Sequence, residues 1–441
     1  MERAWTALVR PSADPGPAAW AVSAKGTRIR FADGVDAFCA TSGLWNVPLG
    51  YGNAEVAEAV GRALRDASYL TLFRRSHPYA EEAAARLIAF TGMPFSRVLF
   101  STSGGAANDA VMKLVRQFWH LAGSPQRRIV VGLRGSYHGL THGAHGLSGD
   151  ELGQAVYGID RRDVRHVPVD DGAGLETLMR REGNRVAAVI VEPVLGTGAV
   201  EVPPSFLAVL DRLRAEHGFL LVADEVATGF GRTGQRFASA GWASPPDAMI
   251  LSKALTNGTC AASAIVVGER IVSAFDREDA LFVHGETQAG TPASCAAILA
   301  TLDLYDSLDA DALFRDVADR LDAVVARLLH HPRIVAAQGR GAFRALRILG
   351  TSAGGREREG AQGGETEQGG GAGPGEGLAP DAVTDLVERI RRRGVVVHPG
   401  PAGIQLIPAA IAAAADLDRA AAAIETALDE QDAAIDERGA A

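Results

Sequence analysis

Short apolar runs alternate with longer amphipathic stretches through the middle of this chain, and that alternation limits the folds it can adopt. The runs have the length of buried strands and span residues 98–101, 129–132, 187–192, 219–224, 248–251 and 264–267. Two of the stretches between them, residues 106–119 and 204–217, carry apolar side chains at helical spacing. Strands that alternate with helices form βαβ units, so we predict an α/β fold with a mainly parallel sheet covered on both faces.

The two ends of the chain have a different pattern from the middle. We predict that residues 50–304 form one large domain, and that residues 1–49 and 305–441 meet in a smaller one. The first end holds a hairpin-like pair, 27–31 and 35–38, and the second holds strand candidates at 343–349, 395–398 and 404–407. Residues 351–378 are rich in glycine and lack apolar spacing. They predict a flexible, solvated loop, with a functional lid as the less favoured alternative.

Charge and hydropathy exclude several classes of protein. The formal net charge is −9, which argues against a nucleic-acid partner. No stretch reaches the roughly 18 uninterrupted apolar residues of a membrane span, and the first residues lack the apolar region of a signal peptide. Cys39, Cys260 and Cys295 are widely spaced, so we expect reduced structural cysteines and no metal site. These features predict a cytoplasmic protein without a membrane partner.

Two side chains that follow apolar runs carry the first chemical signal. In FLLVADEVATGFGRTG, Asp224 ends a buried strand at the sheet edge where α/β proteins bind ligands. In ILSKALTNG, Lys253 lies 29 residues later (253 − 224) between apolar neighbours. Apolar surroundings lower the pKa of an amine and make it nucleophilic towards an aldehyde. An isolated Asp at this place is usually a cap and an isolated Lys usually solvated, so the pair is the informative feature.

A glycine-rich helix start supplies the third element. In VLFSTSGGAANDAVMKLVR a strand leads through Ser103, Gly104 and Gly105 into an amphipathic helix. Glycines let the backbone approach a ligand closely, and helix N-terminal amides bind anions, so this segment predicts a phosphate site. A strand-end carboxylate, a desolvated lysine and a phosphate site are together the parts of a pyridoxal-phosphate (PLP) site.

The motifs also occur in the order of a known family. The chain resembles the class III (omega-type) aminotransferases of PLP fold type I over nearly its whole length. The segments that carry this resemblance are GLWNVPLGYGNAEVAEAV, SGGAANDAVMKLV, SYHG, VIVEPV, DEVATGFGRTG followed by PDAMILSKALTNG, and HGETQAGTPASCAAILATL. The resemblance implies a large domain with a seven-stranded type of sheet, a smaller α+β domain, and transfer of an amino group.

The resemblance also implies residue roles. Lys253 and Asp224 would be catalytic, as the Schiff-base lysine and the partner of the pyridine nitrogen. The cofactor-binding positions would be Ser103, Gly104, Gly105, Tyr137, His138, Glu192, Asp224, Val226, Lys253 and Thr287. Tyr137 would stack on the ring, Val226 would pack on its other face and Glu192 would orient nearby groups. Thr287 would reach the phosphate of the neighbouring subunit, which implies a homodimer with two shared active sites.

Two departures from the family pattern bear on specificity. Gly105 and Ala106 replace a hydroxyl residue and a glutamate, which predicts weaker PLP binding by about 1–2 kcal/mol for one lost hydrogen bond. Trp45 and His398 are candidate substrate residues, and His398 stands where the family has an arginine for a substrate carboxylate. A neutral imidazole cannot replace the guanidinium, whose paired N–H groups bind both oxygens of a carboxylate. Either Arg344 or Arg347 binds the carboxylate, or one substrate lacks it.

We therefore predict an aminotransferase that moves an amino group from an amino acid or amine to a ketone or aldehyde, on a small molecule or a peptide. A bulky or carboxylate-free acceptor in natural-product or modified-peptide (daptide-like) biosynthesis is one setting. An aminomutase or a decarboxylating transaminase would keep the same cofactor residues. A non-catalytic PLP-fold scaffold and an NAD-type dehydrogenase are less favoured, because Lys253 and Asp224 are both retained and no G-x-G-x-x-G opens a helix.

Overall fold

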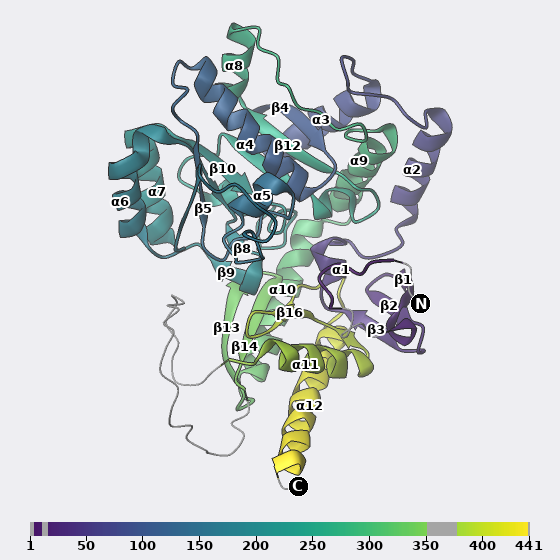
Figure 1. Cartoon of the computed structure of the whole chain (residues 1–441). Coiled ribbons are helices and arrows are strands. Elements are labelled where there is room, and N and C mark those ends of the chain that lie inside the picture. The colour runs from purple at the N-terminus through teal and green to yellow at the C-terminus, as the bar shows by residue number, and fades with distance from the viewer. Residues whose placement is uncertain (1–3, 11–15, 351–376, 440–441) are drawn as a thin grey trace.

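A seven-stranded sheet lies at the centre of the computed structural model, which describes residues 4–10, 16–350 and 377–439. Its order is β4-β12-β11-β10-β7-β5-β6 (Figure 1). The strands are β4 (Phe95–Ser101), β5 (Ile129–Leu133), β6 (Val164–Val167), β7 (Val186–Val191), β10 (Leu220–Asp224), β11 (Ala248–Leu251) and β12 (Ser263–Gly268). Only β12 runs antiparallel to its neighbours in this sheet. The predicted mainly parallel α/β sheet is confirmed.

Helices cover both faces of this sheet. One face packs on α4 (Gly104–Leu121), α5 (His142–Leu147) and α8 (Glu269–Arg277), and the other on α6 (Gly172–Glu182) and α7 (Pro204–His217). Because side chains alternate along a strand, Ile190 of β7 joins the α4 core and Val189 joins the α7 core. Helix α7 has the predicted bounds, since it begins at a proline and ends before Gly218, whose φ of 74° closes the helix.

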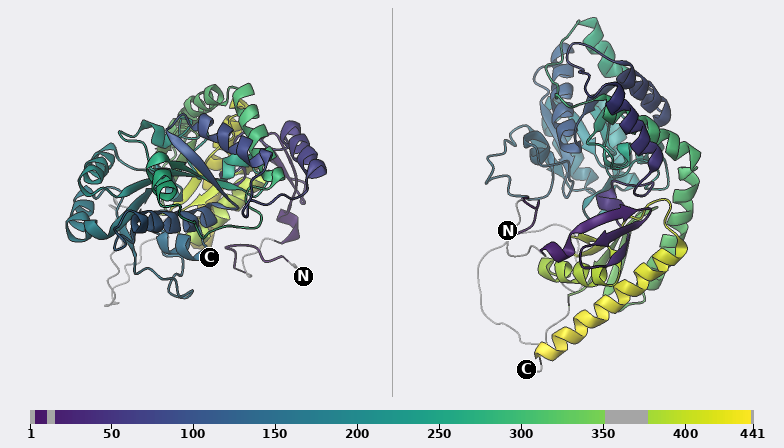
Figure 2. Two further views of the ribbon diagram at one scale, coloured as in Figure 1. Left: turned by 90° about the horizontal axis from the view of Figure 1, so that it is seen from above. Right: turned by 90° about the vertical axis from the view of Figure 1, so that its right-hand side faces the viewer.

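The remaining helices of the large part lead from the β4 side of the sheet to the lower part of the molecule. They are α2 (Ala54–Asp66), α3 (Pro78–Thr91), α9 (Pro292–Ser307) and α10 (Ala310–Leu328). Helix α9 packs against α2 and α3, and α10 continues downwards from it (Figures 1 and 2). These helices share one apolar core with strands of both parts of the molecule.

The N- and C-terminal segments pair with each other in the lower part of the molecule. One sheet has the order β1 (Ala21–Lys25), β2 (Arg28–Phe31), β3 (Asp36–Cys39), β15 (Val395–Val396). The other has the order β13 (Ile334–Arg340), β14 (Phe343–Ile348), β17 (Gly403–Leu406), β16 (His398–Gly400). Helices α11 (Pro380–Arg392) and α12 (Ala414–Gly439) pack beside them. Strand β3 lies parallel to β15, so the two ends do meet, while the exact domain boundaries stay a prediction.

The structure corrects two details of the terminal segments. The strand predicted at 395–398 is divided into β15 and β16, because its two halves pair with different sheets. Of the loop predicted at 351–378, residues 351–376 lie outside the described residues. Its last two residues are ordered against the small sheet, since Gly377 bridges Leu349 and Leu378 is buried.

Over the stretches that the structure describes, no helix combines the length and apolar character that crossing a membrane requires.

Candidate active site

The predicted site residues, except Thr287 and His398, converge at the carboxyl edge of the large sheet. Asp224 ends β10, Lys253 follows β11, Ser103 follows β4 and Glu192 follows β7. They line one cavity of about 450 Å³. Its walls are formed by Trp45, Ser103, Gly104, Gly105, Asn108, Tyr137, His138, Gly139, Leu140, Thr141, Glu192, Asp224, Val226, Ala227, Ser252 and Lys253.

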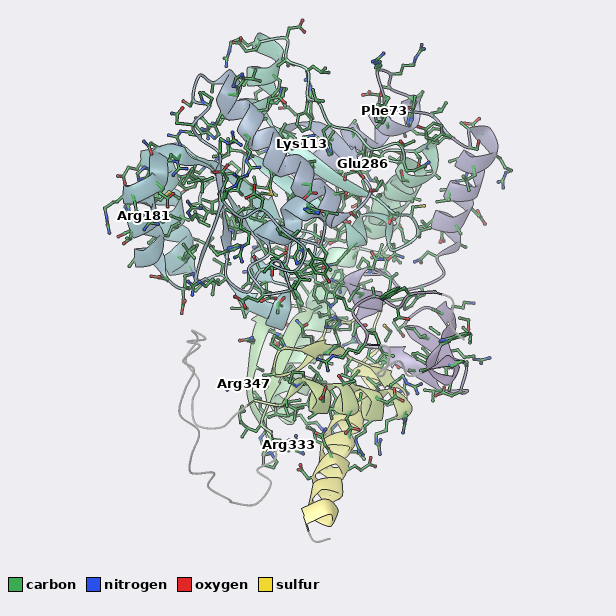
Figure 3. All side chains as sticks on the ribbon, viewed as in Figure 1. Phe73, Lys113, Arg181, Glu286, Arg333 and Arg347 are labelled. Atoms are coloured by element: carbon green, nitrogen blue, oxygen red, sulfur yellow. The ribbon has the colours of Figure 1, made fainter. Side chains whose placement is uncertain are left out.

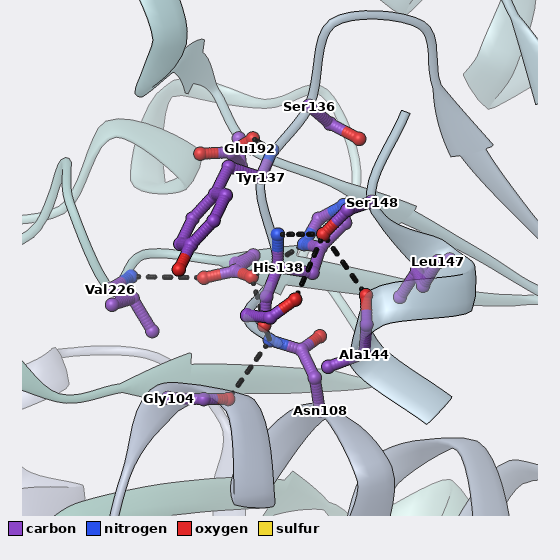
Figure 4. Close-up of polar contacts among 12 residues, drawn as sticks. Gly104, Asn108, Ser136, Tyr137, His138, Ala144, Leu147, Ser148, Glu192 and Val226 are labelled. Carbon is purple, nitrogen blue, oxygen red and sulfur yellow. Dashed lines mark hydrogen bonds and ion pairs between the residues drawn. The ribbon is translucent and has the colours of Figure 1, made fainter. Parts of the chain in front are cut away.

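Asp224 lies at the base of this cavity and accepts three hydrogen bonds. His138 Nδ1 donates to Oδ2 at 2.7 Å and Asn108 Nδ2 donates to the same oxygen at 2.9 Å. The backbone N–H of Val226 donates to Oδ1 at 3.1 Å (Figure 4). The side chain is almost fully buried. Three donors fix the carboxylate in place, and Oδ1 keeps a lone pair for one more donor.

His138 is held through both its side chain and its backbone. Its backbone N–H donates to Ser148 Oγ at 2.9 Å, and that hydroxyl in turn contacts the carbonyl oxygens of Gly139 and Ala144 (Figure 4). Burial opposes protonation, but the hydrogen bond to Asp224 and the charge of that carboxylate outweigh it and raise the pKa of His138. The raised pKa and the hydrogen bond favour a protonated His138 beside the Asp224 carboxylate.

Lys253 is half-buried and is the one lysine that is not exposed. The chain has only three lysines, and Lys25 and Lys113 lie at the surface. Burial lowers the pKa of Lys253 to about 8, although the charges of Glu192 and Asp224 oppose this shift. Its backbone φ is 42°, in the left-handed region that costs a non-glycine residue about 1–3 kcal/mol. A strained lysine with a readily lost proton is typical of a reactive site.

An aromatic ring covers the Lys253 amine. Nζ lies 4.3 Å from the ring centroid of Trp45, which is 8 % exposed and also contacts Phe343 and His398 at centroid distances of 5.3 Å. The indole therefore forms a wall of the cavity beside the reactive amine. That Trp45 contacts the substrate stays a prediction.

The start of helix α4 has the form of an anion cup. Ser103 is the N-cap, and its Oγ accepts the N–H of Ala106 at 3.2 Å. A Cβ on Gly104 would come within 3.2 Å of Val226, and one on Gly105 within 3.2 Å of Thr141 Oγ1. Thr141 therefore explains why position 105 has no side chain, since a larger residue would crowd its hydroxyl. The free N–H groups of this turn fit a phosphate.

Glu192 connects the cavity to the small sheet. It accepts the N–H of Tyr137 at 2.9 Å and of Gly196 at 3.0 Å, and burial raises its pKa to about 7. The carbonyl of Gly196 accepts Gln405 Nε2 at 2.9 Å. The other end of that amide, Oε1, lies 3.2 Å from His398 Nδ1. Since Oε1 can only accept, Nδ1 carries the hydrogen and Nε2 keeps a lone pair.

His398 therefore offers no positive charge to a substrate carboxylate. Burial lowers its pKa, so the imidazole is neutral near pH 7. The alternative carboxylate partners do not replace it. Arg344 pairs with Asp322 and donates to the carbonyl of Gly339, and neither it nor Arg347 lines the cavity. Figure 3 shows Arg347 in the lower part of the molecule, on the small sheet.

Thr287 lies outside the cavity of its own subunit. It is exposed, and its carbonyl accepts the Tyr69 hydroxyl at 3.0 Å. A role at the phosphate of a second subunit stays a prediction.

Two residues of the site were not identified from the sequence. Asn108 binds Asp224, and its position one helical turn after Gly104 was a usable signal, because it faces the same side of α4. Arg232 is fully buried behind Trp45. Arg232 lies within the quoted segment DEVATGFGRTG, but no local pattern predicts its partners, which lie about 190 residues away along the chain.

The fold is that of the PLP-dependent transferases of fold type I. The family model of class-III aminotransferases matches residues 11–428, so the chain belongs to that family. The putrescine–pyruvate aminotransferase of Pseudomonas aeruginosa is 31% identical over 74% of this chain and 76% of its own length. The omega-aminotransferase of Caulobacter vibrioides is 33% identical over 64% and 70%.

A solved structure agrees with this assignment. The amine transaminase of an uncultivated Pseudomonas species, in its PLP-bound form, has a TM-score of 0.86 and 26% identity, and the match covers 98% of this chain and 99% of that one. The predicted enzyme class is confirmed, and the predicted cofactor is the one that this solved structure holds. A dehydrogenase is thereby excluded.

Proposed function

We propose that the cavity binds PLP through Lys253 and that the protein transfers an amino group between an amine or amino acid and a carbonyl compound. The observation that carries the proposal is that a three-fold hydrogen-bonded Asp224 and a lysine with a lowered pKa line one cavity. The α4 start supplies backbone donors for the phosphate. The variant Lys253→Ala tests the assignment through loss of the visible absorbance of the bound cofactor.

Each residue of the cavity has its own role in the proposed reaction. PLP, when bound, supplies an aldehyde for the amino group and a ring that withdraws electrons. Asp224 Oδ1 would hold a proton on the ring nitrogen, and His138 and Asn108 keep that carboxylate in place. Lys253 Nζ removes a proton from the substrate carbon and returns it, and a pKa of about 8 suits a base that works near neutral pH.

We infer further that one substrate lacks a distal carboxylate. Lys253 is the only lysine or arginine among the described residues that line the cavity. His398 is neutral, with a lone pair on Nε2 that accepts N–H or O–H donors. Trp45 adds an apolar wall. These features favour an amine or a neutral ketone, and the Pseudomonas aeruginosa relative is itself named for putrescine, a diamine without a carboxylate.

His398→Arg tests this inference. The variant is expected to raise kcat/KM for dicarboxylates such as 2-oxoglutarate roughly tenfold or more, because a hydrogen bond to a charged group contributes about 1.5–3 kcal/mol. His398→Gln, which stays neutral, is the control and should gain nothing. Half-reactions of the wild type with 2-oxoglutarate and with carboxylate-free aldehydes and ketones give the baseline. Equal rates for both in the wild type, with no gain in His398→Arg, would refute the substrate class.

Product analysis separates the same-fold alternatives. An aminomutase returns the amino group to the same molecule, and a decarboxylating transaminase releases carbon dioxide. Stoichiometric formation of a new amine and a new ketone, without either event, supports the proposed reaction.

We also propose a homodimer with shared active sites. The two segments that meet at Thr287 and Tyr69 carry exposed apolar side chains, a feature typical of interfaces. They are Leu70, Phe73, Leu281 and Val283. The segment around Phe73 packs against the segment around Gly285 (Figure 3). Thr287 is thereby presented outwards, next to this apolar surface.

Phe73→Glu is expected to turn the dimer into monomers and to lower activity at least roughly tenfold, since a buried unpaired charge is strongly unfavourable at an interface. Leu329→Glu is the control, because Leu329 is similarly exposed but lies at the end of α10 in the lower part. Sedimentation should give twice the chain mass for the wild type and for Leu329→Glu. A monomeric, fully active wild type would contradict the shared site.

A further inference from the structure

Arg232 is a buried cation without an acidic partner. It is only 1 % exposed, and none of the ion pairs found among the described residues includes it. Its Nη1 donates to Ser42 Oγ at 2.9 Å and to the carbonyls of Ile407 and Pro408 at 3.4 and 3.2 Å. Its Nη2 donates to the carbonyl of Trp45 at 3.1 Å. Burial lowers the pKa of this arginine to about 9. A desolvated charge is costly, so its position calls for an explanation.

The segment that Arg232 binds is strained. Element α1 (Ser42–Trp45) is a left-handed turn, with φ values of 40° at Ser42, 57° at Gly43, 55° at Leu44 and 65° at Trp45. Each non-glycine residue in this region costs about 1–2 kcal/mol. Such strain persists only where the surroundings hold it, and it gathers at functional sites. Arg232 binds the side chain at the first position of the turn and the carbonyl at the last.

The handedness of the turn determines where Trp45 points. The Trp45 ring lies 4.3 Å from Lys253 Nζ and touches the His398 ring on the small sheet. Figure 1 shows α1 where the large part of the molecule meets the lower part. Ile407 and Pro408, which Arg232 also binds, follow β17 in that lower part. Arg232 follows β10 of the large sheet. Its guanidinium therefore connects the strained turn behind the cavity to the segment that follows β17 of the small sheet.

We propose that Arg232 is a positioning residue that fixes the left-handed turn and so holds Trp45 against Lys253. It acts on the reaction through Trp45 and does not touch the substrate. Its positive charge also adds to the burial effect that lowers the pKa of Lys253, against the opposing charges of Glu192 and Asp224. The inference rests on the proposed role of Lys253.

The first test observes Trp45 directly. Full-length protein labelled with 5-fluorotryptophan is studied by fluorine NMR, with and without added PLP, and the Trp45 resonance is identified by its loss in Trp45→Phe. Arg232→Lys keeps a charge but cannot bridge Ser42 and Trp45. It is expected to shift and broaden the Trp45 resonance in both states. Ser42→Ala, which removes one contact of Arg232, should shift it in the same direction by less and serves if Arg232→Lys does not fold.

Arg333→Lys is the matched control. Arg333 is also buried and donates to the carbonyl of Leu349, but it precedes β13 in the lower part of the molecule (Figure 3) and pairs with Asp432. It should lower the melting temperature and leave the Trp45 resonance unchanged. An unmoved Trp45 resonance in folded Arg232→Lys, or an equal shift in Arg333→Lys, would overturn the proposal.

The second test measures the coupling to catalysis. Arg232→Lys is expected to lower kcat roughly tenfold to a hundredfold, because a shift of about 1 Å in the Trp45 wall of the cavity would misalign the reacting groups. The same change made in Trp45→Phe should cost much less, because the two residues act as one unit. Equal losses in both backgrounds would contradict the positioning role. If Lys253 is not the cofactor lysine, the rates no longer test the positioning role of Arg232. The NMR result still shows whether Arg232 holds Trp45 in place.

Discussion

Lys253→Ala is expected to abolish amino transfer, with turnover reduced by roughly 10⁴-fold or more. The variant loses the covalent link to the cofactor and the base that moves the substrate proton, and a positioned base alone contributes 10²–10⁴-fold. The visible absorbance of the purified protein should disappear at the same time. Because the side chain is flanked by the Trp45 ring and apolar walls, the fold should tolerate the truncation.

The other lysines provide the control for this variant. Lys113→Ala removes an amine that only donates to the carbonyl of Val283, so activity and absorbance should stay near those of the wild type. Kinetics at saturating substrate, together with the spectrum, give both readouts. Retained absorbance and turnover in Lys253→Ala would contradict the assignment.

Asp224→Asn is expected to lower kcat by about 10²–10³-fold while cofactor and fold are retained. The amide has the shape of the carboxylate but no charge, so it cannot hold a proton on the ring nitrogen, and losing a pre-organised electrostatic partner typically costs this much. The change also breaks the charge-assisted bond from His138. Turnover per bound cofactor, measured after dialysis, separates loss of catalysis from loss of binding.

The neighbouring carboxylate is a close control for Asp224. Glu225 is equally buried, but it binds Ser239 and Thr228 and does not line the cavity. Glu225→Gln should therefore lower stability and leave kcat within about twofold. A similar loss of kcat in both variants would mean that Asp224 acts through the fold and not on the cofactor.

The sequence predicted the sheet well where strands are buried on both faces. Strand β7 is fully buried along its six residues and reads as one apolar run, which periodicity detects. Strand β1 was missed because all of its side chains are exposed, β13 because only two of its seven residues are buried, and β6 because Arg165 and His166 interrupt its apolar residues. The antiparallel direction of β12 was not predictable either, since it depends on its partners β4 and β11 and not on its own residues.

The site was predictable to the extent that its residues follow strands. Lys253 and Asp224 each come directly after an apolar run, so their convergence follows from the topology of the sheet. The left-handed turn at Trp45 and its contact with Arg232 depend on residues about 190 positions apart, and no local pattern encodes them. The scaffold alternative loses support because the lysine, the carboxylate and the α4 start line one cavity.

Trapping of the cofactor on its lysine tests the central claim most directly. The purified protein is incubated with PLP, reduced with borohydride, digested and analysed by mass spectrometry. With three lysines in the chain, only Lys25, Lys113 and Lys253 compete for the label. We expect the pyridoxyl group on the peptide that contains Lys253, in stoichiometric amount, and none in Lys253→Ala. Label on Lys25 or Lys113, or no stable label at all, would contradict the account.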